Sequence, residues 1–168
     1  QDYNFDDIRP YTDREARAKI RLLLKDPVFD EVLMHLFKVR PKVKMVKIQL
    51  RMIRNIRQLQ GTFVYDFLRR IINRTSEGLS CFGIEKLDKK KPYLFISNHR
   101  DIVLDPALMN LLIFDKGMNT TQIAIGNNLL LYNWIEHAVK LNRSFVIKRD
   151  LGSRELLESS KKVSHYIR

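Results

Sequence analysis

Cysteine, histidine and long apolar runs are all scarce in this chain of 168 residues. The single cysteine, Cys81, excludes an internal disulfide and is typical of a protein from a reducing compartment. The four histidines are scattered, so no motif has the spacing of metal ligands and we expect no metal site. No apolar run reaches the roughly 20 residues that a transmembrane helix needs.

Acidic residues are also few relative to basic ones. The chain has 31 lysines and arginines against 19 aspartates and glutamates, which gives a formal net charge of +12. A surplus this large predicts an anionic partner, which can be nucleic acid, an acidic membrane surface or a phosphorylated substrate.

The charge imbalance is greatest between Lys38 and Arg57, where no acid occurs. Helical spacing aligns five basic residues in a stripe beside a broad apolar face. Such a helix can lie in a membrane interface, where each basic residue contributes roughly 1 kcal/mol. The alternative is a helix that packs its apolar face on the domain and exposes its charges to water. The predicted membrane-binding residues are Arg40, Lys44, Lys47, Arg51 and Arg54.

Residues 1–78 are predicted to form an N-terminal helical region. Thr12 and Glu15 have the spacing of a capping box, which predicts the start of a helix. Pro27 suits the first turn of the next helix, and Gly61 is a candidate break further on. The expected helices run from Thr12 to about Asp26, from Val28 to Phe37, from Pro41 to about Leu59 and from Thr62 to Arg74.

Short apolar runs alternate with helical patterns from residue 79 onward. This alternation predicts an α/β fold class, with a mixed, parallel-rich sheet covered by helices, over residues 79–168. Gly126-Asn127-Asn128 follows one predicted strand, where substrate contact and ordinary turn chemistry explain it equally well. The expected strands are 79–84, 93–97, 120–125 and 144–148, and the expected helices are 105–116, 129–141 and 153 onward.

A histidine and two acids follow the predicted strand 93–97, in the segment Ser97-Asn98-His99-Arg100-Asp101-Ile102-Val103-Leu104-Asp105-Pro106. Loops at strand ends are where α/β folds place their chemistry. A histidine held by a carboxylate can act as a general base, because the carboxylate orients the ring and stabilises the imidazolium. Either Asp101 or Asp105 can supply that carboxylate.

This segment resembles the first motif of the glycerolipid acyltransferases, N-H-x-x-x-x-D, with one additional residue before Asp105. The longer spacing is similar to that of a hemolysin-like branch, N-H-P-x-x-x-L-D. Leu104-Asp105 matches the end of that pattern, whereas Arg100 replaces its proline. The resemblance implies that His99 and Asp105 are the catalytic residues, with Asp101 as the competing partner.

A second match lies at Phe145-Val146-Ile147-Lys148-Arg149, which resembles the family's second motif, an apolar strand closed by arginine. The resemblance implies that Arg149 helps to bind the phosphate of the acyl acceptor, a role that suits a planar guanidinium. Lys148 and Arg100 are further candidates for substrate binding. The alternative is a strand that ends in two solvated cations.

The family's third motif, a short loop with glutamate and glycine, does not occur up to Arg168. The last helical pattern runs to that residue without a cap. We therefore expect the chain to be part of a longer enzyme, in which the resemblance covers roughly residues 80–168.

The resemblance implies an O-acyltransferase of phospholipid biosynthesis that needs no cofactor. Its donor would be acyl-CoA or acyl carrier protein, and its acceptor glycerol 3-phosphate or a lysophospholipid, at the cytoplasmic face of an anionic membrane. The longer spacing from His99 to Asp105 makes a lyso-ornithine-lipid acyltransferase the nearest alternative. A basic module that binds nucleic acid or membrane without catalysis is another. No recognisable nucleic-acid motif accompanies the charge, so we expect no nucleic-acid partner.

Overall fold

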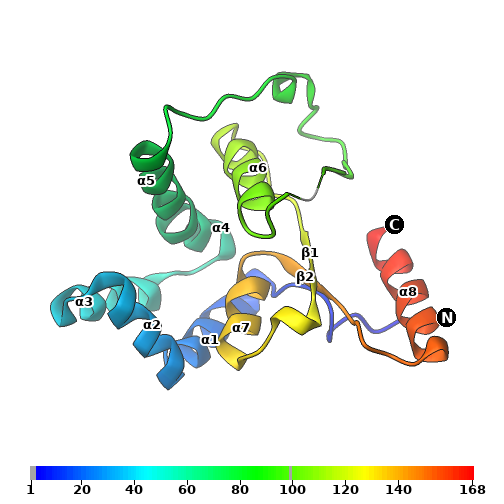
Figure 1. Ribbon diagram of the computed structural model, residues 1–168, viewed down its shortest axis with the longest axis horizontal. Coiled ribbons are helices and arrows are strands. Elements are labelled where there is room, and N and C mark those ends of the chain that lie inside the picture. Colours follow the sequence, from blue (N-terminus) through cyan, green and yellow to red (C-terminus); the bar gives the residue numbers. More distant parts are fainter. Residues whose placement is uncertain (1–2, 99) are drawn as a thin grey trace. The chain divides into compact units, whose positions relative to one another are not determined.

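The computed structural model describes residues 3–98 and 100–168 (Figure 1). Packing divides the chain into two compact units. Unit 1 contains the described residues up to Leu59 together with Gln122–Arg168, and unit 2 contains Gln60–Thr121. This division follows contacts alone, and the domain boundary expected between residues 78 and 79 stays a prediction.

The N-terminal helices of unit 1 begin where side chains satisfy unpaired backbone N–H groups. The Glu15 carboxylate accepts a hydrogen bond from the Thr12 N–H at 2.7 Å, which confirms the predicted capping box. Asp26 caps the next helix by accepting from Val28 and Phe29 at 2.9 and 3.1 Å. These helices are α1 (Asp13–Leu23), α2 (Pro27–Phe37), α3 (Arg40–Met52) and the short α4 (Ile56–Leu59).

The single helix expected from Pro41 to Leu59 is wrong, because the chain breaks between α3 and α4. Ile53 is extended, with φ −61° and ψ 132°, and its side chain is buried. The Asp13 carboxylate then accepts the Ile56 N–H at 2.8 Å and starts α4. A contact between residues 43 positions apart therefore stops one helix and begins another.

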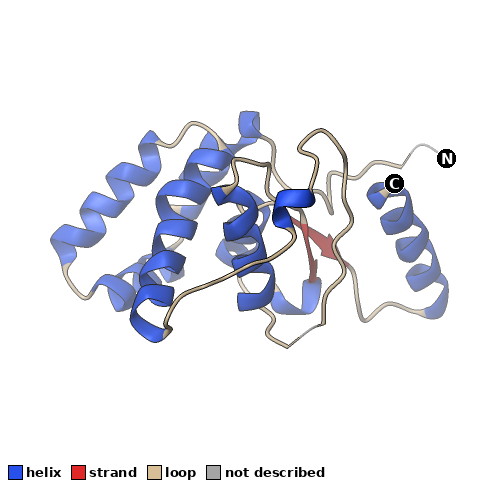
Figure 2. Cartoon of the chain, turned by 90° about the horizontal axis from the view of Figure 1, so that it is seen from above, coloured by secondary structure: helices blue, strands red, loops and turns tan. Residues whose placement is uncertain are grey.

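Strands β1 (Ile123–Gly126) and β2 (Ser144–Ile147) pair in parallel, with Gly126 opposite Ile147 (Figure 2). Helix α7 (Asn133–Leu141) connects them and packs against α1 and β2. The expected mixed α/β fold, with a parallel sheet and an N-terminal helical region, is confirmed. Because the strands are parallel, both carboxyl ends lie at the same edge of the sheet, and the loops that follow them meet there.

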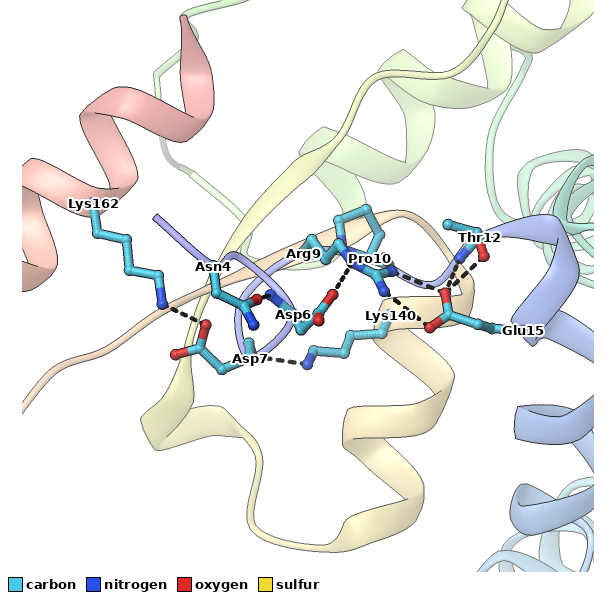
Figure 3. Close-up of polar contacts among 9 residues, drawn as sticks. All are labelled: Asn4, Asp6, Asp7, Arg9, Pro10, Thr12, Glu15, Lys140 and Lys162. Atoms are coloured by element: carbon cyan, nitrogen blue, oxygen red, sulfur yellow. Dashed lines mark hydrogen bonds and ion pairs between the residues drawn. The ribbon is translucent and has the colours of Figure 1, made fainter. Parts of the chain in front are cut away.

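The segment before α1 runs along β2 and is tied to it. The Val146 N–H donates to the Ile8 carbonyl at 2.8 Å, and the Ile8 side chain is almost fully buried. Figure 3 shows the polar contacts of this segment, including those of Asp7 with Lys140 and with Lys162 on α8 (Ser153–Ile167). The N-terminal segment is therefore a structural part of the sheet region.

Unit 2 is built around a cluster of Tyr65, Leu68 and Leu111, against which Phe114 packs. The expected break at Gly61 takes the form of a π-helical turn. A Cβ on Gly61 would lie 3.0 Å from the Phe114 ring, so glycine allows this close approach. The elements of the unit are η1 (Gln60–Tyr65), α5 (Asp66–Thr75), the short turn η2 (Ile84–Lys86) and α6 (Leu104–Asp115).

The strands expected at 79–84 and 93–97 are wrong, because neither segment is a strand in the part of the chain that the structure describes. Leu94 and Ile96 are 72% and 89% exposed. A strand requires a hydrogen-bonded neighbour, and an apolar run alone does not supply one.

Candidate active site

Of the two predicted catalytic residues, the structure describes Asp105, at the start of α6. His99 falls outside the described residues. The Asp105 carboxylate turns back to the loop that leads into α6, where its Oδ2 atom accepts the N–H groups of Arg100 and Asp101, both at 2.9 Å. Two backbone donors hold the carboxylate in one orientation, directed to the chain that follows position 99.

Asp101 has a different role in the same loop. Its Oδ1 atom accepts the N–H groups of Val103 and Leu104 at 2.8 and 2.7 Å, so it satisfies backbone donors at the start of α6. Both acids therefore shape the loop. The assignment of Asp105 rather than Asp101 as the partner of His99 stays a prediction.

Lys148 and Arg149, the two cations predicted at the end of β2, belong to unit 1 and have different surroundings. The Lys148 ammonium lies 2.6 Å from one carboxylate oxygen of Asp7. Lys162 lies 2.6 Å from the other oxygen, a contact drawn in Figure 3. Burial acts to raise the pKa of Asp7, but the hydrogen bonds and charges of both lysines lower that pKa to about 2. Lys148 is thus paired with an acid of the same chain, which it shares with Lys162.

Arg149, in contrast, is exposed and forms no ion pair with any of the described residues. The same holds for Arg100 at the entrance to α6, whose backbone N–H binds Asp105 but whose guanidinium forms no ion pair within residues 3–98 and 100–168. Of the three candidates for substrate binding, Arg149 and Arg100 therefore have guanidinium groups that are available to bind an external anion, whereas Lys148 is already paired.

Gly126 and Asn127, for which the sequence left substrate contact and ordinary turn chemistry equally open, contact Arg149. The Asn127 Oδ1 atom accepts the Arg149 N–H at 2.7 Å. A Cβ on Gly126 would lie only 2.9 Å from the Arg149 Nε atom. The signal in the sequence was a glycine and an asparagine directly after a strand, but nothing local indicated that they would contact Arg149, 22 positions beyond Asn127.

A cavity of about 500 Å³ lies in unit 1, between the end of β2 and α8. The apolar side chains that line it include Ile147, Leu156, Val163 and Ile167, and Lys148 also contributes to the wall. The space is a half-open pocket, and its lining also includes Ser159, Ser160, Ser164 and Arg168. A pocket with apolar walls and two cations can accommodate a molecule with a hydrocarbon part and an anionic group.

The basic stripe predicted on residues 38–57 is largely on the surface. Four of its five members are exposed, and Lys47 is partly covered and paired with Asp30 of α2. Four of the five cations lie on α3, whereas Arg54 follows the break at Ile53 and lies outside the helix. A set of exposed apolar side chains shares α3 with the four cations. That set consists of Met45, Ile48 and Met52. None of the helices in the described ranges is long and apolar enough to cross a membrane.

Comparison with protein-family models shows the family to which the chain belongs. The model of the family described as Acyltransferase matches residues 78–167. No curated protein and no solved structure matches the chain significantly. The matched segment begins one residue before the expected start of the α/β region, and it includes both His99 and Arg149.

Proposed function

The chain belongs to the acyltransferase family, and from this premise we propose that it moves a fatty acyl group from a thioester to a hydroxyl of glycerol 3-phosphate or of a lysophospholipid. The donor is acyl-CoA or acyl carrier protein. The observation that carries the proposal is the orientation of Asp105, whose carboxylate is held by two backbone N–H groups at the loop that contains position 99.

In the proposed reaction His99 removes the proton from the acceptor hydroxyl as that oxygen attacks the thioester carbonyl. A carbon–oxygen bond forms, the carbon–sulfur bond breaks, and the proton passes from His99 to the departing thiolate. Asp105 orients the imidazole and stabilises its charged form. These steps need only side chains of the protein and the two substrates.

Arg149 is proposed to bind the acceptor phosphate, with Arg100 in support. A guanidinium forms two parallel hydrogen bonds to a phosphate, which fixes orientation as well as charge. Lys148 is paired with Asp7 and is therefore proposed to contribute less than Arg149.

The cavity beside Lys148 supports an acceptor that carries an acyl chain, because its lining is mostly apolar. On this basis we favour a lysophospholipid over glycerol 3-phosphate. We also propose that the exposed cations and apolar side chains of α3 hold the protein at the cytoplasmic face of an anionic membrane, where lysolipids reside.

The central test is His99→Ala in the intact protein, with transfer of a labelled acyl group to lysophosphatidic acid as the readout. Loss of a general base should reduce the rate by roughly 10²- to 10⁴-fold while the circular dichroism spectrum stays unchanged. His35→Ala, at an exposed position of α2, is the matched control and should retain activity. A folded His99→Ala protein with normal turnover would overturn the mechanism.

A lyso-ornithine-lipid acyltransferase is the second candidate, favoured by the additional residue between His99 and Asp105. Its acceptor carries no phosphate. Parallel assays with lysophosphatidic acid and lyso-ornithine lipid distinguish the two, because Arg149→Ala should impair only the use of a phosphate-bearing acceptor.

A further inference from the structure

Gly126 leaves space for the side chain of Arg149 at the end of the sheet. A Cβ at this position would meet the Asn128 Oδ1 atom and would lie 2.9 Å from Nε and 3.2 Å from Cδ of Arg149. Gly126 itself is buried and has φ −73°, so its backbone would accept any L-amino acid. Glycine is therefore needed here for clearance rather than for backbone freedom.

The backbone of Arg149 is fixed from two sides. Asn127 accepts its N–H at 2.7 Å, which joins the residue after β1 to the residues after β2. Asp150 has φ 58°, so the chain turns away directly after Arg149. The hydrogen bond to Asn127 thus fixes the backbone at Arg149, and the Nε end of the side chain packs against Gly126, the last residue of β1.

We propose that Gly126 and Asn127 are positioning residues for Arg149, which set where its guanidinium meets the phosphate of the acyl acceptor. The inference rests on the proposed phosphate role of Arg149. A bidentate pair depends on orientation, and a small displacement of a substrate-binding group is costly in a reaction that relies on alignment. Gly126 and Asn127 act through Arg149 and touch no reacting atom.

The first test is Gly126→Ala, because the atoms that crowd the new methyl group belong to flexible side chains that can move. The protein should fold with unchanged thermal stability, while the displaced Arg149 raises the KM for lysophosphatidic acid roughly 10- to 100-fold. Gly152→Ala is the matched control, since the nearest atom to its Cβ would lie 4.0 Å away. Asn127→Ala should act in the same direction as Gly126→Ala, and Asn128→Ala, which leaves the Arg149 backbone bond in place, should not.

Two further measurements separate positioning from a general structural defect. With 1-acylglycerol, which lacks the phosphate, Gly126→Ala should have the activity of the unmodified protein. In an Arg149→Ala background, Gly126→Ala should cause no additional loss, because the residue through which it acts has been removed.

The outcomes also separate this inference from the proposed function. If Arg149→Ala leaves the KM for lysophosphatidic acid unchanged, the phosphate role itself is wrong and the inference fails with it. If Arg149→Ala raises that KM while Gly126→Ala and Asn127→Ala do not, the phosphate role stands and the positioning role is refuted. Equal losses with 1-acylglycerol and lysophosphatidic acid would also refute it.

Discussion

The carboxylate of Asp7 lies 2.6 Å from the ammonium of Lys148, although 141 positions separate them in the sequence. The same carboxylate lies 2.6 Å from Lys162 of α8. One acid near the start of the chain thus joins the end of β2 to a helix near its last residue. It also pairs with one of the two cations that follow β2, which leaves Arg149 as the stronger candidate for binding an external anion.

Asp7→Asn should destabilise unit 1, because both lysines lose their partner. The pKa of Asp7 is lowered from 3.8 to about 2, so this stabilisation is present above pH 3.8 and is lost as the pH falls towards 2. Asp7 is partly exposed and solvent screens its charge, so we expect a loss of about 1 kcal/mol at neutral pH. Urea unfolding at several pH values measures it. Glu158→Gln, in an exposed pair with Lys161, is the control. If the free energy of unfolding of Asp7→Asn depends on acid pH as it does in the unmodified protein, the stabilising role of Asp7 is contradicted.

His137 should make stability depend on pH near neutrality. Burial, followed by the charge of Lys19, lowers the pKa of His137 below 6.5, and Tyr11 Oη lies 2.8 Å from its Nδ1 atom. The unfolded chain therefore takes up this proton more readily, so the free energy of unfolding should fall as the pH drops through 6.5. His137→Asn should flatten that slope in urea unfolding. His35→Asn, at an exposed position of α2, is the matched control, and an identical pH slope of the free energy of unfolding in both variants would refute this role for His137.

Local signals in the sequence predicted several elements well. The capping box of Thr12 and Glu15 and the first-turn position of Pro27 depend on contacts within a few residues. Strand 144–147 falls inside its expected range, and strand 123–126 overlaps the expected 120–125 but ends one residue later. The break at Ile53 depends on Asp13, a residue far away in the sequence, and no local pattern contains it. Apolar runs at 79–84 and 93–97 failed as strands because pairing requires a neighbour that composition does not reveal.

In the candidate site, too, contacts between residues distant in the sequence could not be predicted. The residue types at Asp105 and Arg149 were sufficient to propose their chemistry from the sequence and its resemblance. The clearance that Gly126 gives to Arg149, and the compensation of Lys148 by Asp7, join segments that are distant in the chain. Such contacts determine which cation is already paired within the chain, and they can be seen only in the three-dimensional structure.

Substitutions at Asp101 and Asp105 should separate helix capping from catalysis. Asp101→Asn retains a side-chain oxygen for the N–H groups of Val103 and Leu104, so stability and turnover should stay near normal, whereas Asp101→Ala should cost about 1 kcal/mol. Asp105→Asn also retains an acceptor for the loop but removes the charge that supports His99, and kcat should fall roughly 10²- to 10⁴-fold. Thermal unfolding and acyl-transfer kinetics measure both. The assignment would be reversed if Asp101→Asn lost activity while Asp105→Asn kept it.

The last prediction concerns the proposed membrane face on and after α3. Its exposed cations should attract anionic lipid, and the apolar side chains on the same helix should enter the interface. The triple substitution of Lys44, Arg51 and Arg54 by glutamine should weaken binding to phosphatidylserine vesicles without unfolding the protein, because all three side chains are exposed. Lys47 is left unchanged, since its pairing with Asp30 helps to join α3 to α2.

The matched control replaces Lys86, Lys90 and Lys91, which are exposed in unit 2, and removes the same amount of charge. This control should bind vesicles almost as well as the unmodified protein if the face on α3 is the binding surface. Salt should weaken the attraction, since the Debye length falls from about 10 Å at 0.1 M to about 3 Å at 1 M. Vesicle co-sedimentation and competition with duplex DNA at the same salt concentration measure these effects. Equal loss of binding in both triple variants would mean that net charge alone drives association, and preference for DNA over anionic vesicles would favour a nucleic-acid partner instead.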